Sequence, residues 1–409
     1  MGGIMKLLFL CTSEFQLLTA LNIRCHMHPS DDADIIVDNY HGEEKELAER
    51  LRETNLFRKV FYVKSYIEHE TLHAYFHAFT EGTCSPPFFH AIKNSLLFAK
   101  IRIAKLFMGA RAYVEQMVDD SSALQLREYD AFFAFGTKPI TCHLAEYFMQ
   151  LNGHCQMNLL DEGIGTYVAH EIGRHSEVVN KCYAYAADLV SYEMEICEIP
   201  KLKKTDREFV EILNFVFQFR PFDIEDYRNS VIVFSENGSE VKMPKYLTIS
   251  PLLSKTLFRN SYKRHLKEEE EFYERLRMMN LAIQVAGREK NCGTVWMKLN
   301  PRASRDQIVE YQGRRDIRLL RRWNLPWELL ALNCPLENSV LLANTTSAVC
   351  MHDDVIDASD EPVQRILLWR LSKYRPSEKF DKFLAALEKK HGNLHVPKTM
   401  DELASIRFT

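Results

Sequence analysis

The sequence predicts an α/β protein built from two doubly wound lobes, and two observations support this fold class. The chain has 409 residues, more than one hydrophobic core usually serves, so two domains are expected. Short apolar runs also alternate with helical patterns along the chain, which is typical of parallel sheets covered by helices on both faces. With 46% hydrophobic and 26% charged residues, the composition is that of an ordinary globular protein.

The first lobe is expected over residues 1–190. Apolar runs that end in turn or capping residues predict its strands at 6–11, 33–37, 59–63, 130–135 and 156–160. Apolar residues at helical spacing predict helices over 15–23 and 43–52, and a further helix is expected after the turn at 136–139.

The second lobe is expected over residues 241–375. Residues 191–240 are less periodic and contain Pro200 and Pro221, so this range is predicted to connect the lobes. Strands are predicted at 246–250, 294–299, 317–320 and 339–343, with a helix over 268–285. A charged amphipathic helix over 379–390 belongs to an expected C-terminal helix and tail at 376–409.

Charge and cysteine usage exclude several classes of protein. The formal net charge of -4 gives no general attraction to polyanions, so no nucleic-acid partner is expected. The ten cysteines include no C-x-x-C pair, which argues against zinc ribbons and disulfide frameworks and indicates reduced thiols. No apolar run reaches the roughly 20 residues that span a bilayer. The short apolar run at 5–11 is interpreted as a buried strand rather than a signal peptide, so a cytoplasmic protein is expected.

Polar residues follow several predicted strands of the first lobe, where open α/β sheets bind their ligands. Thr12 and Ser13 follow the first strand, and Thr137 follows the strand at 130–135. Asp161 and Glu162 follow the strand at 156–160, and Gly163 permits close approach of a ligand. One well-placed carboxylate here suits a general base that activates a hydroxyl, although each of these turns could equally be a plain helix cap.

The second lobe has a corresponding series of polar strand ends. Asn300 and Pro301 are expected in a turn in which the Asn300 amide could donate a hydrogen bond and Arg302 could pair with a phosphate. Glu328, near a predicted helix start, could accept hydrogen bonds from ribose hydroxyls. Helix starts bind phosphate through free N–H groups, and one such turn is rich in hydroxyls: Thr345, Thr346 and Ser347. A Pro turn and ordinary helix caps are the structural alternatives.

In their order along the chain, these segments resemble glycosyltransferase family 52, the bacterial lipooligosaccharide and capsule sialyltransferases. The segment C-T-S-x-F-Q-L-L at 11–18 is similar to the opening of that family. L-D-E-G-I-G at 160–165 is similar to the acidic–acidic–Gly motif of bacterial sialyl- and polysialyltransferases. Residues 298–302 lie where those enzymes have a His-Pro motif, L-P-W-E at 325–328 resembles their Pro-aromatic-Glu segment, and 345–347 resembles their serine/threonine motif.

The resemblance implies a GT-B fold, in which two Rossmann-like lobes face a central crevice, and inverting transfer of sialic acid from CMP-sialic acid to a glycan acceptor of lipooligosaccharide or capsule. It implies no metal and no cofactor beyond the donor. Asp161 or Glu162 would deprotonate the acceptor, which Thr12, Ser13, Thr137 and Gly163 would bind. The implied donor-binding residues are Asn300, Pro301, Arg302, Glu328, Thr345, Thr346 and Ser347.

Asn300 departs from the family pattern, because it takes the place of the histidine of the His-Pro motif. Asparagine donates a hydrogen bond but cannot supply a proton to the leaving group. Three interpretations stay open: activity through hydrogen bonding alone, use of another nucleotide sugar, or impaired function, including a non-catalytic nucleotide- or glycan-binding role.

Two further segments suggest other activities. His69-Glu70-x-x-His73 matches the H-E-x-x-H pattern, in which two histidines bind zinc and the glutamate is the base, so a zinc hydrolase is a remote alternative. Residues 88–113 are basic and apolar, which suits either an amphipathic helix on the anionic inner face of the membrane or a lobe helix with a solvated basic face. The sequence leaves a homodimer open.

Overall fold

The computed structural model describes residues 3–38, 44–64, 109–151, 156–169, 179–235, 259–288, 294–301, 303, 305–373 and 378–407. Arg302, the predicted strand at 246–250, the His69–His73 segment and most of the basic range at 88–113 lie outside the described residues. Within the described ranges, no helix combines the length and apolarity that a membrane crossing requires.

The chain forms two compact units. The first comprises Met1–Pro200 and Glu211–Gln218, and the second comprises Lys201–Val210 and Phe219–Thr409. The range 191–240, expected as a connection, instead contains a strand of each sheet and the helix α8 (Arg207–Val216). The range 376–409, expected as a C-terminal helix and tail, contains two helices and the edge strand of the second sheet.

The first unit is built on a seven-stranded parallel sheet with the order β3-β2-β1-β4-β5-β6-β7. Its strands are β1 (Lys6–Cys11), β2 (Asp32–Val37), β3 (Lys59–Tyr62), β4 (Ala131–Ala134), β5 (Gln156–Leu160), β6 (Val179–Ala184) and β7 (Glu195–Glu198). Its helices are α1 (Glu14–His26), α2 (Glu44–Glu53), α5 (Ala110–Met117), α6 (Pro139–Leu151) and α7 (Ile164–Val168). Short 3-10 turns occupy Ser121–Ala123, Leu126–Glu128 and Ala187–Leu189.

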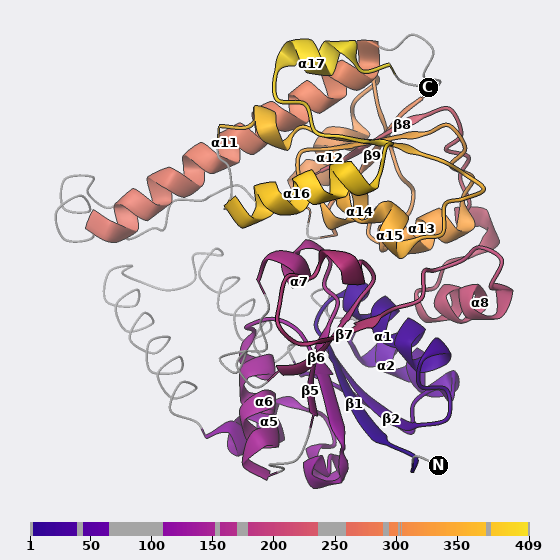
Figure 1. Ribbon diagram of the computed structural model, residues 1–409, viewed down its shortest axis with the longest axis vertical. Helices are drawn as coiled ribbons and strands as arrows, with labels where there is room; N and C mark the ends of the chain where they lie inside the picture. Colours follow the sequence, from indigo (N-terminus) through magenta and orange to yellow (C-terminus); the bar gives the residue numbers. More distant parts are fainter. Residues whose placement is uncertain are drawn as a thin grey trace, which may run out of the picture. The chain divides into compact units, whose positions relative to one another are not determined.

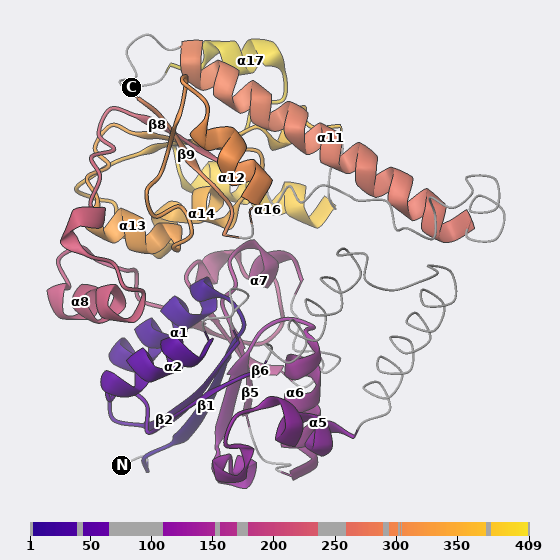
Figure 2. The same ribbon diagram turned by 180° about the vertical axis from the view of Figure 1, so that it is seen from behind.

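The local sequence explains how the middle of this sheet forms. Leu7, Leu8, Phe9 and Leu10 are fully buried along β1, as expected for a strand that is covered on both faces. Helix α1 starts at the N-cap Ser13, whose Oγ accepts a hydrogen bond from the backbone N–H three residues later. Helices α1 and α2 cover one face of the sheet, and α5 and α6 cover the other (Figures 1 and 2).

The second unit is built on a six-stranded parallel sheet with the order β10-β9-β8-β11-β12-β13. Its strands are β8 (Val231–Phe234), β9 (Val295–Lys298), β10 (Arg318–Leu319), β11 (Val340–Ala343), β12 (Gln364–Leu367) and β13 (Leu394–His395). Its helices are α11 (Arg259–Arg288), α12 (Arg305–Gln312), α13 (Trp327–Asn333), α14 (Ser347–Cys350), α15 (His352–Val355), α16 (Glu378–Lys390) and α17 (Met400–Ser405). The 3-10 turns Pro221–Asp223 and Trp369–Leu371 complete this list.

The core of the second unit lies between this sheet and the long helix α11. Met278, Ala282 and Ala286 of α11 pack against Val233 and Leu342 from the central strands. Helix α16 lies on the opposite face of the sheet from α11 (Figures 1 and 2). The two parallel, helix-covered sheets confirm the predicted α/β class with two doubly wound lobes, on which the GT-B prediction rests.

Candidate active site

The carboxyl ends of the central strands of the first sheet bring the predicted residues of the first lobe together. The chain order reverses between β1 and β4, which is the position where open α/β sheets bind ligands. Ser13 after β1 and Glu162 after β5 are hydrogen-bonded to each other, with the Ser13 hydroxyl donating to Glu162 Oε2 over 3.0 Å. Thr137 after β4 is exposed, and its carbonyl accepts a hydrogen bond from the Cys142 thiol.

Asp161 is a buried structural anchor. Its side chain is 1% exposed and accepts hydrogen bonds from the backbone N–H of Gly163 (2.7 Å), the backbone N–H of Tyr185 (3.0 Å), the Tyr167 hydroxyl (2.6 Å) and the Thr166 side chain. Burial raises the pKa of this carboxyl, and the hydrogen bonds act in the opposite direction. Because its oxygens are engaged in holding the turn, Asp161 is poorly suited to accept a proton from a substrate.

Glu162 has the properties that a general base requires. It is partly exposed, and burial raises its pKa to about 7, the effect of burial being larger than the opposing effect of the hydrogen bond from Ser13. When the pKa of a base lies near neutral pH, a large fraction of it is ionised and can accept a proton, and the protonated form still releases the proton readily. The sequence left Asp161 and Glu162 undistinguished, and the structure shows that Glu162 is the more exposed of the two.

The two glycines beside this pair set the position of the turn. Gly163 has φ +77°, in the left-handed region that favours glycine, and directly precedes α7. A Cβ at Gly165 would lie 3.2 Å from the ring of Phe135 and 3.8 Å from Cγ of Glu162. Glycine at 165 therefore allows the start of α7 to approach Phe135, the residue that follows β4, closely.

Lys138, after β4, is a site residue that the sequence analysis missed. Its Nζ donates to the backbone carbonyl of Thr12 (2.8 Å) and to Asp38 Oδ2 (3.1 Å), so it joins the carboxyl ends of β1, β2 and β4. Its positive charge lowers the pKa of Glu162. The available signal was its position directly after Gly136 and Thr137 at a strand end.

In the second unit, Glu328 lies at the start of α13 and is 6% exposed. Burial raises its pKa to about 7, while the positive charge of Lys298 at the end of β9 acts in the opposite direction. Among the described residues, the Glu328 carboxylate accepts a hydrogen bond from one donor, the backbone N–H of Glu328 itself. A buried carboxylate with so few donors is suited to accept hydrogen bonds from a ligand.

The other predicted donor residues lie at neighbouring strand ends. The Asn300 backbone N–H donates to Ser235 Oγ over 2.8 Å, which ties the end of β9 to the end of β8. Pro301 continues this turn and is partly buried. The turn at Thr345–Ser347 follows β11, which neighbours β8, and Thr346 is the N-cap residue of α14 without a side-chain capping bond.

Arg365 supports this region from inside the second unit. Its side chain is fully buried, and NH1 donates to the carbonyls of Val349 (3.3 Å) and Cys350 (2.8 Å) at the end of α14. NH2 donates to Oδ2 of the partly buried Asp353 over 2.8 Å and forms an ion pair with it. Arg365 was not predicted from the sequence, because a single charged residue inside a short strand forms no recognisable motif.

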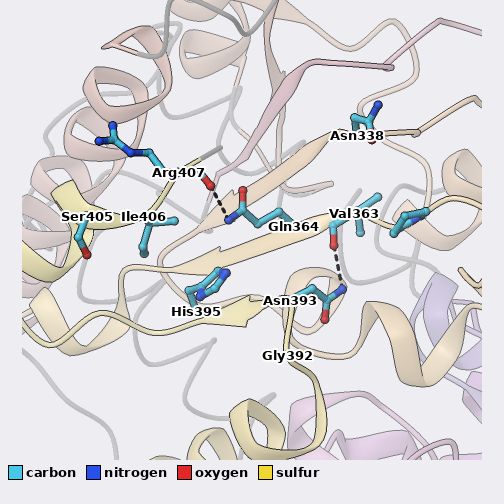
Figure 3. A pocket seen from close by; sticks show the side chains of 10 residues that line it. Asn338, Val363, Gln364, Gly392, Asn393, His395, Ser405, Ile406 and Arg407 are labelled. Atoms are coloured by element: carbon cyan, nitrogen blue, oxygen red, sulfur yellow. Dashed lines mark hydrogen bonds between the residues drawn. The ribbon is translucent and has the colours of Figure 1, made fainter. Parts of the chain in front are cut away.

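A cavity of about 600 Å³ lies at the amino-terminal ends of strands β11, β12 and β13, away from the carboxyl ends that carry the predicted donor residues (Figure 3). Its lining includes Asn338 before β11, Gln364 at the start of β12 and Asn393 before β13. Gln364 donates to the carbonyl of Arg407, and Asn393 donates to that of Val363 (Figure 3). None of the predicted site residues lines this cavity. Across the described ranges, no group of three or more His, Cys, Asp or Glu side chains is arranged to hold a metal ion.

Comparison with known proteins found no matching family model and no matching curated protein. Among solved structures, the chain is similar to an α/β-galactoside α-2,3-sialyltransferase from Photobacterium phosphoreum, at 8% identity and a TM-score of 0.46 over 99% of this chain and 100% of that one. A Listeria monocytogenes protein assigned as a UDP-N-acetylglucosamine 2-epimerase has 9% identity and a TM-score of 0.44 over 98% and 86%. Anabaena HepE in complex with UDP has 12% identity and a TM-score of 0.41 over 98% and 88%.

Proposed function

We propose that this protein is an inverting glycosyltransferase in which Glu162 is the general base. The observation that carries the proposal is a partly exposed carboxyl with a pKa of about 7 at the ligand-binding edge of the first sheet, beside a second carboxyl that is engaged as a structural anchor. The different surroundings of the two adjacent acids support a structural role for Asp161 and a chemical role for Glu162.

The proposed reaction moves one proton and exchanges one bond. Glu162 accepts the proton of an acceptor hydroxyl while the oxygen attacks the anomeric carbon of the donor sugar. The bond between that carbon and the nucleotide phosphate oxygen breaks, the nucleotide leaves, and the configuration at the carbon is inverted. Ser13, Thr12, Thr137 and Gly163 are the proposed acceptor-binding residues, because they lie at the strand ends beside the base.

The donor nucleotide is proposed to bind at the carboxyl edge of the second sheet. Glu328 would accept hydrogen bonds from the ribose hydroxyls, which supply the donors that its buried carboxylate lacks among the described residues. Asn300 and Pro301 would contact the phosphate together with the hydroxyls at 345–347. Arg302 is also proposed as a phosphate ligand from the sequence.

For the donor we propose CMP-sialic acid and for the acceptor a glycan of lipooligosaccharide or capsule, in a metal-independent reaction in the cytoplasm. The proposal of this donor follows the sequence resemblance to family 52. Asn300 favours a second candidate, a transferase that uses another nucleotide sugar, because the family's histidine is absent at that position.

A thermal-shift titration with CMP, CDP, UDP and GDP, each with and without Mg²⁺, tests the donor assignment. A ligand that binds only the folded state raises its apparent stability. A shift with CMP alone that Mg²⁺ does not change is expected. A shift with UDP or GDP would select the second candidate, and no shift with any of the four nucleotides would contradict both.

Transfer to a glycan acceptor is then measured for the unmodified protein and Glu162→Gln. Loss of one catalytic base typically lowers the rate by about 10²–10⁴-fold. An unchanged rate in Glu162→Gln would remove Glu162 from the mechanism. Because the donor residues belong to the other unit, Glu162→Gln should retain the nucleotide-induced thermal shift.

A further inference from the structure

We propose that Gln16 is a positioning residue for Glu162, which acts with Ser13 to hold this carboxylate in a fixed orientation and in its ionised form. The inference rests on the proposed function in one respect, the role of Glu162 as the general base. Gln16 lies in the first turns of α1 and is 1% exposed, and neither the composition nor the strand-end pattern assigned it a role.

The orientation of the Gln16 carboxamide is fixed by the backbone beside it. The backbone N–H of Thr12 donates to Gln16 Oε1 over 2.6 Å. The oxygen end of the carboxamide is therefore turned to Thr12, and its NH₂ group is the end that remains to donate elsewhere. The Gln16 side chain forms a hydrogen bond with Glu162 that lowers the pKa of Glu162.

The direction of the Ser13 hydrogen bond is fixed in a similar way. Ser13 Oγ accepts the backbone N–H of Gln16 over 3.2 Å, as the N-cap of α1. Its O–H is therefore free to donate to Glu162 Oε2, 3.0 Å away. One turn of chain, T-S-x-x-Q, thus presents two donors to the carboxylate, and donors to the charged form favour that form.

The other charged and titratable groups facing Glu162 come from three strand ends. Asp161 after β5 raises the pKa of Glu162, and Lys138 after β4 lowers it. Cys11 at the end of β1 is buried, and both its burial and the charge of Glu162 raise the pKa of the thiol, so it stays neutral. Burial is the largest influence on Glu162 and opposes ionisation, so the two donors from α1 keep the base functional at neutral pH.

The variant Gln16→Met tests the proposal, because methionine keeps the length of the side chain and removes the carboxamide. The titration of Glu162 is followed by NMR of ¹³C-glutamate-labelled protein, in which the signal missing from Glu162→Gln identifies residue 162. We expect the titration midpoint of Glu162 to rise by about one pKa unit. The loss of a hydrogen bond to a charged group changes the free energy by about as much as a shift of one pKa unit does. Gln16→Glu should raise it further, because a second carboxylate would face the first.

Gln150→Met, an exposed position on α6, is the matched control and should leave the midpoint unchanged. In the transferase reaction, Gln16→Met should move the acidic limb of the kcat/KM profile upward by the same amount as the NMR midpoint. A folded Gln16→Met protein whose Glu162 midpoint equals that of the unmodified protein would overturn the inference. A shifted midpoint in a protein without transferase activity would instead contradict the proposed function and leave the positioning of the carboxylate standing.

Discussion

Replacing Glu162 by glutamine should make the protein more stable, and this gain should depend on pH. In the folded state burial raises the pKa of Glu162 from 4.5 to about 7. The unfolded chain therefore loses this proton at a lower pH than the folded chain does. The folded state favours the protonated form of Glu162, so the free energy of unfolding is highest below pH 4.5. It falls as pH rises from 4.5 through about 7, because the carboxyl must then ionise in a buried position. The change in pKa corresponds to about 3 kcal/mol at about 1.4 kcal/mol per pKa unit.

Urea denaturation of the unmodified protein and of Glu162→Gln at pH 5 and pH 8 measures this effect. Above the folded-state pKa the variant should be more stable by up to about 3 kcal/mol, and at pH 5 the difference should shrink by more than half. Glu49→Gln, at an exposed position of α2, is the control and should behave like the unmodified protein at both pH values. A difference that does not change with pH, or an unmodified protein that is the more stable one at pH 8, would refute the argument that Glu162 is a desolvated base.

Three further predictions concern other residues. Gly165→Ala should cost about 1–3 kcal/mol of stability in urea denaturation, because its Cβ would press on a buried aromatic ring, whereas Gly287→Ala has open space and should be neutral or stabilising. Glu328→Gln should weaken nucleotide binding about tenfold in calorimetric titration while raising stability at pH 8, since burial also raises the pKa of Glu328 to about 7. Arg365→Met should cost about 3–5 kcal/mol in urea denaturation, because it removes a fully buried guanidinium that pairs with Asp353 and donates to the carbonyls at the end of α14.

The central strands could be predicted from sequence because burial on both faces gives them continuous apolar runs. The observed bounds of β1 and β5 agree with the predicted ones, and β2, β3, β4, β9, β10 and β11 differ by one or two residues at their ends. Strands without such a run escaped prediction. β7 reads E-I-C-E and is only partly buried, and β13 has just two residues. β8 is a short buried V-I-V-F run, but the prolines and turns around it led to the prediction of a connection between the lobes.

The candidate site was predictable in position but not in detail. Strand ends located Ser13, Asp161 and Glu162, because parallel strands bring their carboxyl ends to one edge of the sheet. Gln16 and Lys138 were missed for a physical reason. A buried glutamine within an apolar helix and a lysine after a turn have no distinctive spacing, and their roles depend on which distant residues they contact.

The proposed division of roles between Asp161 and Glu162 rests on the different surroundings of their side chains in the turn after β5. The two acids are adjacent in the turn after β5, and their side chains nevertheless enter different environments. Asp161 enters the interior of the lobe, where Tyr167 and the Tyr185 N–H satisfy it. Glu162 faces the turn before α1, where it stays partly exposed. Asp161 thereby fixes the turn beside Glu162, the proposed general base.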